Sequence, residues 1–530
     1  MILFKGGYIY DGTGSEPFIG DILVDNDKIV KVEHDIPVED GWDVVDLKGL
    51  SISPGFIDAH SHNDWFAIKK NPQKYFEPFI RQGITSFITG NCGLSAVGFD
   101  PDTQHVGKVG GGLFSYTDTT GVYPSVSEFF SAIDKNNPCN IAVLAGHCSA
   151  RTSVAGYENR PLTEAERSEM LNIMENALKQ GACGLSLGLM YEPGIYAGID
   201  ELKDVAKLCE KYDRPMTVHP RACSAVSMTY PLLGRPHLLR ALDELVEIAS
   251  GTKMKLQYSH AIFVGRRSFR CKDELLAILH GLKDKGVDMG FDIYSELLGV
   301  SVITVVLPAW YQVLTLEQKR HWFNKLKLSI LIRATIILLG FGWDDIQIAY
   351  IGPRYEQYEG KSVAQIAKEM DKSCLDAYLD LCEMSNFKGR INMGPYSTPE
   401  IVSELSRDKN CLYMTDAWVE DHGVQNPAIY DCFPKFLKFS LLGTGDSMPN
   451  TIKKMTSAVA ERFSIKNRGV IKPGYYADLT VFDERKLHDG QEDQEQSFGI
   501  ENVYINGIKV LDDNILDAEA IKHSGRAMKS

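Results

Sequence analysis

Apolar runs rich in β-branched residues alternate with helical patterns along the middle of the chain, and this alternation constrains the fold most. It is typical of βαβ units, in which helices join the strands of a parallel sheet. Helices are predicted over residues 163–180, 201–212 and 273–285, the first opening with Thr163 in a capping pattern and closing at Gly181. Eight candidate strands accompany them: 51–62, 84–93, 140–147, 181–189, 214–221, 253–261, 287–295 and 411–417. The sequence therefore predicts an α/β fold, a (β/α)₈ barrel of the TIM type.

Both ends of the chain consist of short strand patterns and turns. Near the start, residues 22–24 and 29–30 flank an Asp-Asn-Asp turn, and near the end Asn506-Gly507 separates two apolar runs. Asn-Gly between alternating runs is a strong hairpin signal. We expect the two ends to form one small β domain together.

These patterns divide the chain into two predicted domains. The β domain comprises residues 1–52 and 464–530, and the barrel comprises residues 53–463. The stretch from 296 to 410, between strands seven and eight, is far longer than one crossover requires. It predicts an insertion, at about 296–350, that covers the active site as a lid.

Charge and cysteine usage exclude several classes of function. The net charge is −14, so no basic stripe is available to neutralise phosphates, and we expect no nucleic-acid partner. Eleven cysteines without paired spacing fit a reducing cytoplasm better than a disulfide framework. The N-terminus lacks the pattern of a signal peptide. The most apolar stretch, residues 329–343, is interrupted by Arg333, and a bilayer span needs about 20 residues. We expect it to be a buried strand or helix, and we expect no membrane partner.

Side chains that bind metals follow the predicted strands at corresponding positions. In a (β/α)₈ barrel the carboxyl ends of the strands converge on one face, where the active site lies. A lone His-x-His pair or a lone cysteine is usually structural, but six such positions together indicate a metal site. The six are His60, His62, Cys92, His219, His260 and Asp416.

The residue types fit zinc. His60 and His62 are two residues apart on a strand and point to the same side, so they can bind one metal. Thiolate, imidazole and carboxylate are zinc ligands, and a catalytic site leaves a position open for water. Asp416 suits a general base and acid that takes a proton from that water and passes it to the leaving nitrogen.

Several motifs resemble those of one enzyme family. Residues 54–64 read PGFIDAHSHND, which is similar to the first-strand signature of the amidohydrolase superfamily. More narrowly, the chain resembles the N-acyl-D-amino-acid deacylases (D-aminoacylases), with matching motifs in order from about residue 3 to 510. They are GIT at 83–85, GNCG at 90–93, GLMYEPGIYA at 188–197, YSH at 258–260, KMT at 454–456 and GYYADL at 474–479. The GNCG motif is the most specific of them.

This resemblance implies different roles for the six residues, which would form two metal sites. Cys92, His219 and His260 would hold one tightly bound Zn²⁺, with the cysteine in place of the modified lysine used elsewhere in the superfamily. The remaining three would form a weaker second site in which Asp416 is the general acid and base. The substrate would be a small amide, the barrel would be a monomer or homodimer, and the insertion would cover the active site.

Two departures from the family pattern concern the substrate. The family lysine after the strand-six Ser-His is absent, because residues 259–262 read SHAI, and the Pro-His-Pro-Arg stretch is absent at 425–428, which read QNPA. Both cations would meet a substrate carboxylate, and an unpaired buried charge is costly. Arg221 is the first replacement to consider, and Arg151, Arg266 and Arg267 are others. We predict that the substrate contacts Arg221, Tyr191, Tyr294 and His147.

Three functions follow from these observations. The first is zinc-dependent hydrolysis of an N-acyl-D-amino acid or related N-acyl compound. The second is hydrolysis of a cyclic amide, as in hydantoinases and dihydropyrimidinases, for which no carboxylate anchor is required. The third is a non-catalytic barrel scaffold, which the presence of all six competent side chains disfavours.

Overall fold

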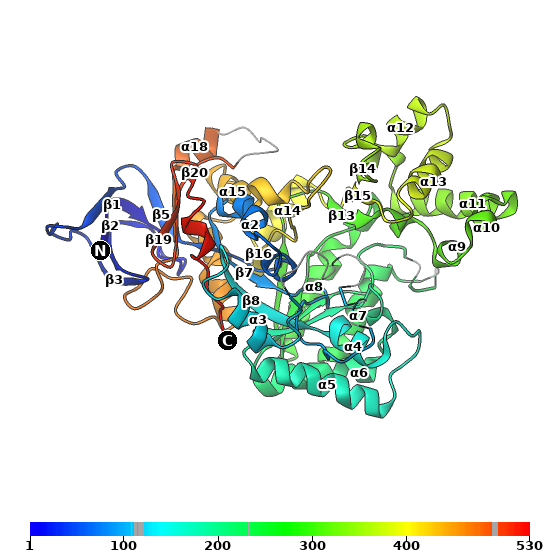
Figure 1. Cartoon of the computed structure of the whole chain (residues 1–530), viewed down its shortest axis with the longest axis horizontal. Coiled ribbons are helices and arrows are strands. Elements are labelled where there is room, and N and C mark those ends of the chain that lie inside the picture. Colours follow the sequence, from blue (N-terminus) through cyan, green and yellow to red (C-terminus); the bar gives the residue numbers. More distant parts are fainter. Residues whose placement is uncertain are drawn as a thin grey trace.

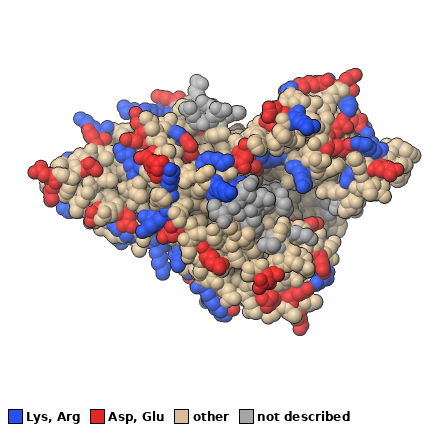
Figure 2. Space-filling view, viewed as in Figure 1, with Lys and Arg blue, Asp and Glu red and all other residues tan. Residues whose placement is uncertain are grey.

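Three sheets organise the part of the chain described by this computed structural model, namely residues 1–105, 107, 109–110, 114, 121–227, 229–231, 234–489 and 497–530. One sheet is the wall of a barrel, one combines both ends of the chain, and a small third sheet lies in a protruding lobe (Figure 1). Figure 2 shows acidic and basic side chains interspersed over the visible face.

The barrel wall contains eight strands in parallel register. In spatial order they are β6 (Phe56–Asp58), β7 (Ile84–Thr89), β8 (Asn140–Gly146), β9 (Gly184–Gly188), β10 (Pro215–His219), β11 (Lys255–Tyr258), β12 (Asp288–Ile293) and β16 (Cys411–Tyr413). Their residues are almost all buried, as expected for a parallel sheet covered by helices. The Ala59 amide donates to Tyr413 and the Asp416 amide to His60, so the chain beyond β6 and β16 joins the first and last strands. The predicted (β/α)₈ barrel is confirmed.

Helices surround this barrel and connect its strands. α5 begins where the sequence predicts, because Thr163 caps it and Glu166 reciprocates in a capping box. The helices packed around the strands are α1 (Asp64–Ala67), α2 (Gln73–Ile80), α3 (Val126–Ile133), α4 (His147–Ala155), α5 (Glu164–Lys179), α6 (Ile199–Tyr212), α7 (His237–Ala249), α8 (Lys272–Asp284), α14 (Pro399–Ser406), α15 (Ala428–Leu441), α16 (Met448–Met455) and α17 (Ser457–Arg462).

Both ends of the chain share the second sheet, as predicted. Its strands are β1 (Ile2–Ile9), β2 (Phe18–Asp25), β3 (Lys28–Glu33), β4 (Asp43–Asp46), β5 (Ser51–Pro54), β17 (Leu479–Phe482), β18 (Ile500–Ile505), β19 (Ile508–Asp512) and β20 (Ile515–Leu516). β5 pairs antiparallel with β17, which joins the two ends, and α18 (Glu484–Asp489) follows β17. Asn506 and Gly507 turn between β18 and β19 with φ of 51° and 76°, which confirms the predicted hairpin.

The single strand predicted at 51–62 is in fact two strands in different sheets. Gly55 separates β5 from β6, and a Cβ at this position would lie 2.4 Å from the Thr85 side chain. The absence of a side chain at residue 55 therefore lets the chain pass tightly from the terminal sheet into the barrel.

The insertion after β12 forms the lobe at the upper right of Figure 1. Its sheet has the order β13 (Gly299–Val302), β15 (Arg390–Met393), β14 (Ile346–Tyr350). The lobe helices are α9 (Ala309–Gln312), α10 (Leu316–Arg320), α11 (Trp322–Leu339), α12 (Val363–Glu369) and α13 (Cys374–Met384). None of the helices in the described part of the chain is both long and apolar enough to cross a membrane.

Candidate metal centre

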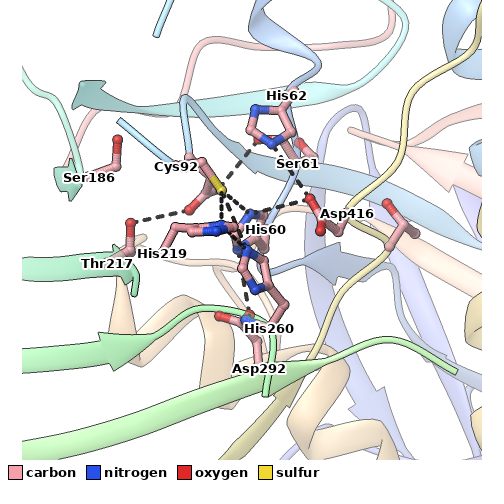
Figure 3. Close-up of polar contacts among 12 residues, drawn as sticks. His60, Ser61, His62, Cys92, Ser186, Thr217, His219, His260, Asp292 and Asp416 are labelled. Atoms are coloured by element: carbon pink, nitrogen blue, oxygen red, sulfur yellow. Dashed lines mark hydrogen bonds and ion pairs between the residues drawn. The ribbon is translucent and has the colours of Figure 1, made fainter. Parts of the chain in front are cut away.

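The six predicted metal ligands converge at the carboxyl ends of the barrel strands (Figure 3). They end or directly follow β6, β7, β10, β11 and β16, which are remote in sequence but open on the same end of the barrel. The four histidines and the cysteine are buried, with His60 fully inaccessible. Asp416 is the exception, because 23% of its side chain is exposed. It is therefore the member of the set that a substrate or water molecule can approach.

The Cys92 thiol lies at the centre of an imidazole cluster. Its Sγ is 3.4 Å from His60 Nε2, 3.6 Å from His219 Nδ1 and 3.6 Å from His260 Nε2. Zinc with tetrahedral sulfur and nitrogen ligands separates them by about 3.6 Å, given its usual bond lengths. These three distances fit that geometry, whereas the 2.7 Å between His219 Nδ1 and His260 Nε2 is shorter. The donor set thus fits a zinc ion near the thiol.

A second cluster adjoins the first through His60. Asp416 Oδ1 lies 3.5 Å from both His60 Nε2 and His62 Nε2, close to the separation of about 3.4 Å expected for nitrogen and oxygen ligands of one zinc ion. Two groups, His60-Cys92-His260 and His60-His62-Asp416, each bring their ligand atoms within 4.8 Å of one another. His60 therefore stands between the two clusters, and the number of metal ions that they hold stays a prediction.

The backbone is strained at three of the six positions. Cys92, His260 and Asp416 have φ of 53°, 35° and 47°, in the left-handed region that non-glycine residues rarely adopt. Such conformations cost about 1–3 kcal/mol each and concentrate at functional sites. At each of these positions the chain turns sharply just beyond a strand, which brings a ligand side chain over the barrel.

Two buried carboxylates hold these turns in place. Asp58 accepts from the His60 amide at 3.1 Å and from the Thr415 amide at 3.1 Å, so it ties the first strand end to the last. Asp292 accepts from the His260 amide at 2.6 Å and lies 3.5 Å from His60 Nδ1. A carboxylate behind a histidine fixes the orientation of the ring and raises its basicity as a ligand.

The electrostatics of the metal-free site favour a thiolate and a carboxylate. Burial raises the pKa of the Cys92 thiol, but the His60 charge and the hydrogen bonds from His219 and His260 outweigh it and hold the pKa well below its usual range. Burial likewise raises the pKa of Asp416, and His60 and His62 reverse this to a low value. Both side chains are therefore anionic, the state in which they bind metals.

The pKa values of the His62 and His260 imidazoles shift in the opposite direction. Burial lowers the pKa of His62, but Asp416 and Cys92 raise it to about 9. Burial also lowers the pKa of His260, and Cys223 and Cys92 raise it to about 10. In the metal-free protein near neutral pH, these two rings are consequently protonated.

This protonation predicts pH-dependent metal binding. A protonated imidazole offers no lone pair, so a metal must displace a proton until the pH reaches the raised pKa of about 9 for His62. We expect the affinity of metal-free protein for Zn²⁺ to rise between about pH 6 and that value, by about tenfold per pH unit for each proton released. Competition with a chromophoric chelator at several pH values, corrected for the chelator's own titration, measures it. If the affinity does not change across this pH range, the expectation is contradicted.

The predicted substrate-contacting residues fall into two groups. Tyr191 lies at the metal cluster, with its hydroxyl 3.4 Å from His219 Nδ1. Tyr294 is buried near Asp416, and its pKa is raised first by burial and second by the Asp416 charge. In contrast, His147 Nε2 bonds Glu201 at 2.8 Å, and Arg221 forms an ion pair with Glu244 at 2.8 Å.

The other candidate arginines are also turned away or engaged. The Arg151 Nε donates to Glu201 at 3.1 Å, and Arg266 pairs with Asp345 at 2.7 Å. Arg266 and Arg267 are both exposed. The guanidinium nitrogens of Arg221 are all engaged by Glu244 and by backbone carbonyls, whereas His147 Nδ1 and Arg151 Nη1 have no hydrogen-bond partner among the described residues.

Sequence patterns did not indicate the aromatic wall around His62. Phe114 stacks on the His62 ring at 5.0 Å and Trp418 meets the same ring edge-on at 5.6 Å. Phe114 lies outside the predicted strands and carried no signal. Trp418 directly follows the predicted strand 411–417, and Asp292 lies near the end of the predicted strand 287–295. A search of strand ends could therefore have found both. The wall therefore places two apolar rings against His62 beside its polar contact with Asp416.

The site combines a thiolate, imidazoles and a carboxylate at the strand ends of a (β/α)₈ barrel. This combination is typical of metal-dependent hydrolases. Residues 43–294 match the model described as "Amidohydrolase family". Over the full length, the chain is 24% identical to a D-aminoacylase of Alcaligenes xylosoxydans xylosoxydans, covering 99% of this chain and 97% of the relative. The chain therefore contains an amidohydrolase domain, and its full-length homologues are D-aminoacylase and N-acyl-D-aspartate deacylase.

Solved structures share the fold. An N-acyl-D-glutamate deacylase from Bordetella bronchiseptica, complexed with zinc and a phosphonate inhibitor, superposes with a TM-score of 0.80 at 22% identity, covering 100% of this chain and 99% of its own. A D-aminoacylase with a binuclear metal center gives 0.78 at 24% identity with the same coverage. A D-hydantoinase from Thermus sp. gives 0.56 at 13% identity, again over 100% and 99% of the two chains.

Proposed function

We propose that the chain is a zinc-dependent hydrolase that cleaves the amide bond of an N-acyl-D-amino acid or a related N-acyl compound. The observation that carries the proposal is the cluster of Cys92 with the His60, His219 and His260 imidazoles, next to a partly exposed Asp416. The deacylase relatives support metal-dependent amide hydrolysis as the reaction type.

The metal ligands and the acid–base group have distinct roles in this proposal. Cys92, His219 and His260 would hold the tight zinc, and His60 and His62 would hold the weaker position with Asp416. A zinc ion bound there would supply a lowered pKa for water and a polarised substrate carbonyl. Asp416, ionised because of its low pKa, is the group that would accept a proton and return it to the leaving nitrogen.

The tyrosines and the aromatic wall orient the substrate. Burial holds the pKa of Tyr191 and of Tyr294 well above the usual value, so both hydroxyls stay protonated and can donate hydrogen bonds to substrate oxygens. Phe114 and Trp418 exclude water beside His62, which strengthens the electrostatic contacts made there. His147 and Arg221 support the site through their contacts with Glu201 and Glu244, respectively.

A cyclic amide is the second candidate substrate. Arg221, Arg151 and Arg266 all pair with carboxylates of the chain. A ring amide requires no cation for an α-carboxylate, so this observation favours it.

A substrate screen separates these candidates. Zinc-loaded protein is assayed with N-acyl-D-amino acids, N-acyl-L-amino acids, hydantoins and dihydropyrimidines, with metal content measured in the same preparation. We expect hydrolysis of N-acyl-D-amino acids. Turnover of rings alone would replace the deacylase proposal by the cyclic-amide one, and purified protein with no stoichiometric metal and no activity restored by zinc would favour a scaffold.

The cellular context and domain limits belong to the same proposal. All eleven cysteines are unpaired thiols, which supports the reducing cytoplasm as the compartment. We also propose residues 1–52 with 464–530 as the β domain and residues 53–463 as the barrel, in a monomer or homodimer that acts on a small-molecule amide.

A further inference from the structure

Helix α11 (Trp322–Leu339) of the lobe exposes an unusual amount of apolar surface. Trp322, Phe323, Leu326, Ile330 and Ile337 are 68%, 55%, 50%, 64% and 62% exposed. The opposite side packs into the lobe through the buried Leu328 and Ile332. A helix that is apolar all round is normally buried all round. Contiguous exposed apolar surface of this kind marks an interaction site.

Four of these five exposed residues form one stripe with a basic residue on each flank. At 3.6 residues per turn, Phe323, Leu326, Ile330 and Ile337 fall within about 40° of a common line along the helix. Lys327 and Arg333 lie about 60° to either side of that line. The helix contains no acidic residue. An apolar centre flanked by long basic side chains is the arrangement of a helix that lies in a membrane interface.

We propose that α11 docks the protein on a membrane surface that contains anionic lipids. Charge complementarity selects this occupant. Arg333 makes no ion pair with any residue of the described ranges, and Lys327 is exposed, with its Nζ over the Trp310 ring at 4.2 Å from the centroid. The two cations are therefore available to lipid phosphates, while the stripe between them enters the headgroup region. This inference revises the expectation from sequence alone that the chain has no membrane partner.

A second copy of the chain fits this surface less well. A two-fold axis at Ile330 would place Lys327 of each copy against Arg333 of the other, and no acidic residue of the helix could compensate. A single helix pair also buries less than the roughly 1,000 Å² that a specific interface requires.

The position of the helix permits contact with a flat surface. α11 lies at the outer end of the lobe, away from the terminal sheet (Figure 1). The net charge of −14 repels an anionic surface, but repulsion between exposed charges is screened beyond about 8 Å at physiological salt. Attachment therefore depends on insertion of the apolar stripe together with the two local cations.

Co-sedimentation of the full chain with vesicles tests the proposal. We expect binding to vesicles of phosphatidylcholine and phosphatidylglycerol at 7:3, and weaker binding to phosphatidylcholine alone. Ile330→Asp should reduce partitioning at least about tenfold, and Arg333→Ala about fivefold. Ile515→Asp is the matched control, because Ile515 is also apolar and 73% exposed but lies in the terminal sheet. Thermal unfolding checks that each variant is folded.

Three results would overturn the proposal. The wild-type chain could fail to bind both kinds of vesicle, or Ile330→Asp could bind as well as Ile515→Asp. In the third, neither the wild-type chain nor Ile330→Asp would bind vesicles, and analytical ultracentrifugation would show a wild-type dimer that Ile330→Asp dissociates. That result would assign the stripe to a contact with a second copy of the chain.

Discussion

Replacing Asp416 by asparagine is expected to leave bound zinc near the wild-type level while lowering kcat by about 10²–10⁴-fold, the usual contribution of general acid–base catalysis. The amide keeps an oxygen at the position that lies 3.5 Å from the His60 and His62 rings. It cannot accept and return a proton. Because the thiol cluster around Cys92 does not depend on Asp416, the tight metal should remain.

The matched control for this variant is Asp421→Asn. Asp421 lies five residues further along the same loop and pairs with Lys74 at 2.6 Å, away from the ligands. It should lose little activity. Zinc content by atomic absorption and kcat for the substrate found in the screen are measured on both variants. Near-wild-type turnover of Asp416→Asn would show that another group moves the proton.

The barrel could be predicted because the sequence signals of its strands and helices are local and recur along the chain. Each strand is a buried apolar run and each helix begins and ends with its own signals, as Thr163 and Gly181 show at α5. The parallel order of strands then follows from short right-handed connections. Position at a strand end was enough to group His60, Cys92, His219, His260 and Asp416, since all such ends meet at one face.

What the sequence could not provide depends on contacts between remote segments. Nothing around residue 55 says that the run from 51 to 62 changes sheets, because the cause is the Thr85 side chain against Gly55. Arg221 follows β10, as a ligand would, yet it turns to Glu244 on α7. Which partner a charged side chain selects is set by packing, and no periodic pattern encodes it.

The stretch at 329–343 illustrates the same limit on the scale of a helix. Its apolar composition predicts burial, and Ile332 on its inner side is indeed buried. The outer side, with Ile330 and Ile337, is exposed. An apolar composition predicts that every side of a helix is buried, but only the structure shows which side packs against the rest of the chain.

Replacing Cys92 by alanine should remove the tight metal and, with it, activity. Cys92 is the thiol within 3.6 Å of three imidazole nitrogens, and the backbone at residue 92 is held at a φ of 53° to bring it there. Loss of groups behind metal ligands already weakens binding by about 10–100-fold, so loss of the thiolate itself should cost more than about 100-fold. Metal content after dialysis and the zinc affinity at a fixed pH measure this.

The control is Cys148→Ala, which removes a thiol from the same neighbourhood. Cys148 is buried and its Sγ contacts the Gly188 carbonyl at 3.5 Å, while burial raises the pKa of its thiol to about 12. It therefore stays protonated and binds no metal, so Cys148→Ala should retain zinc even if it is less stable. Equal zinc loss in both variants would attribute the effect to packing, whereas loss confined to Cys92→Ala identifies that thiolate as the ligand on which the site depends.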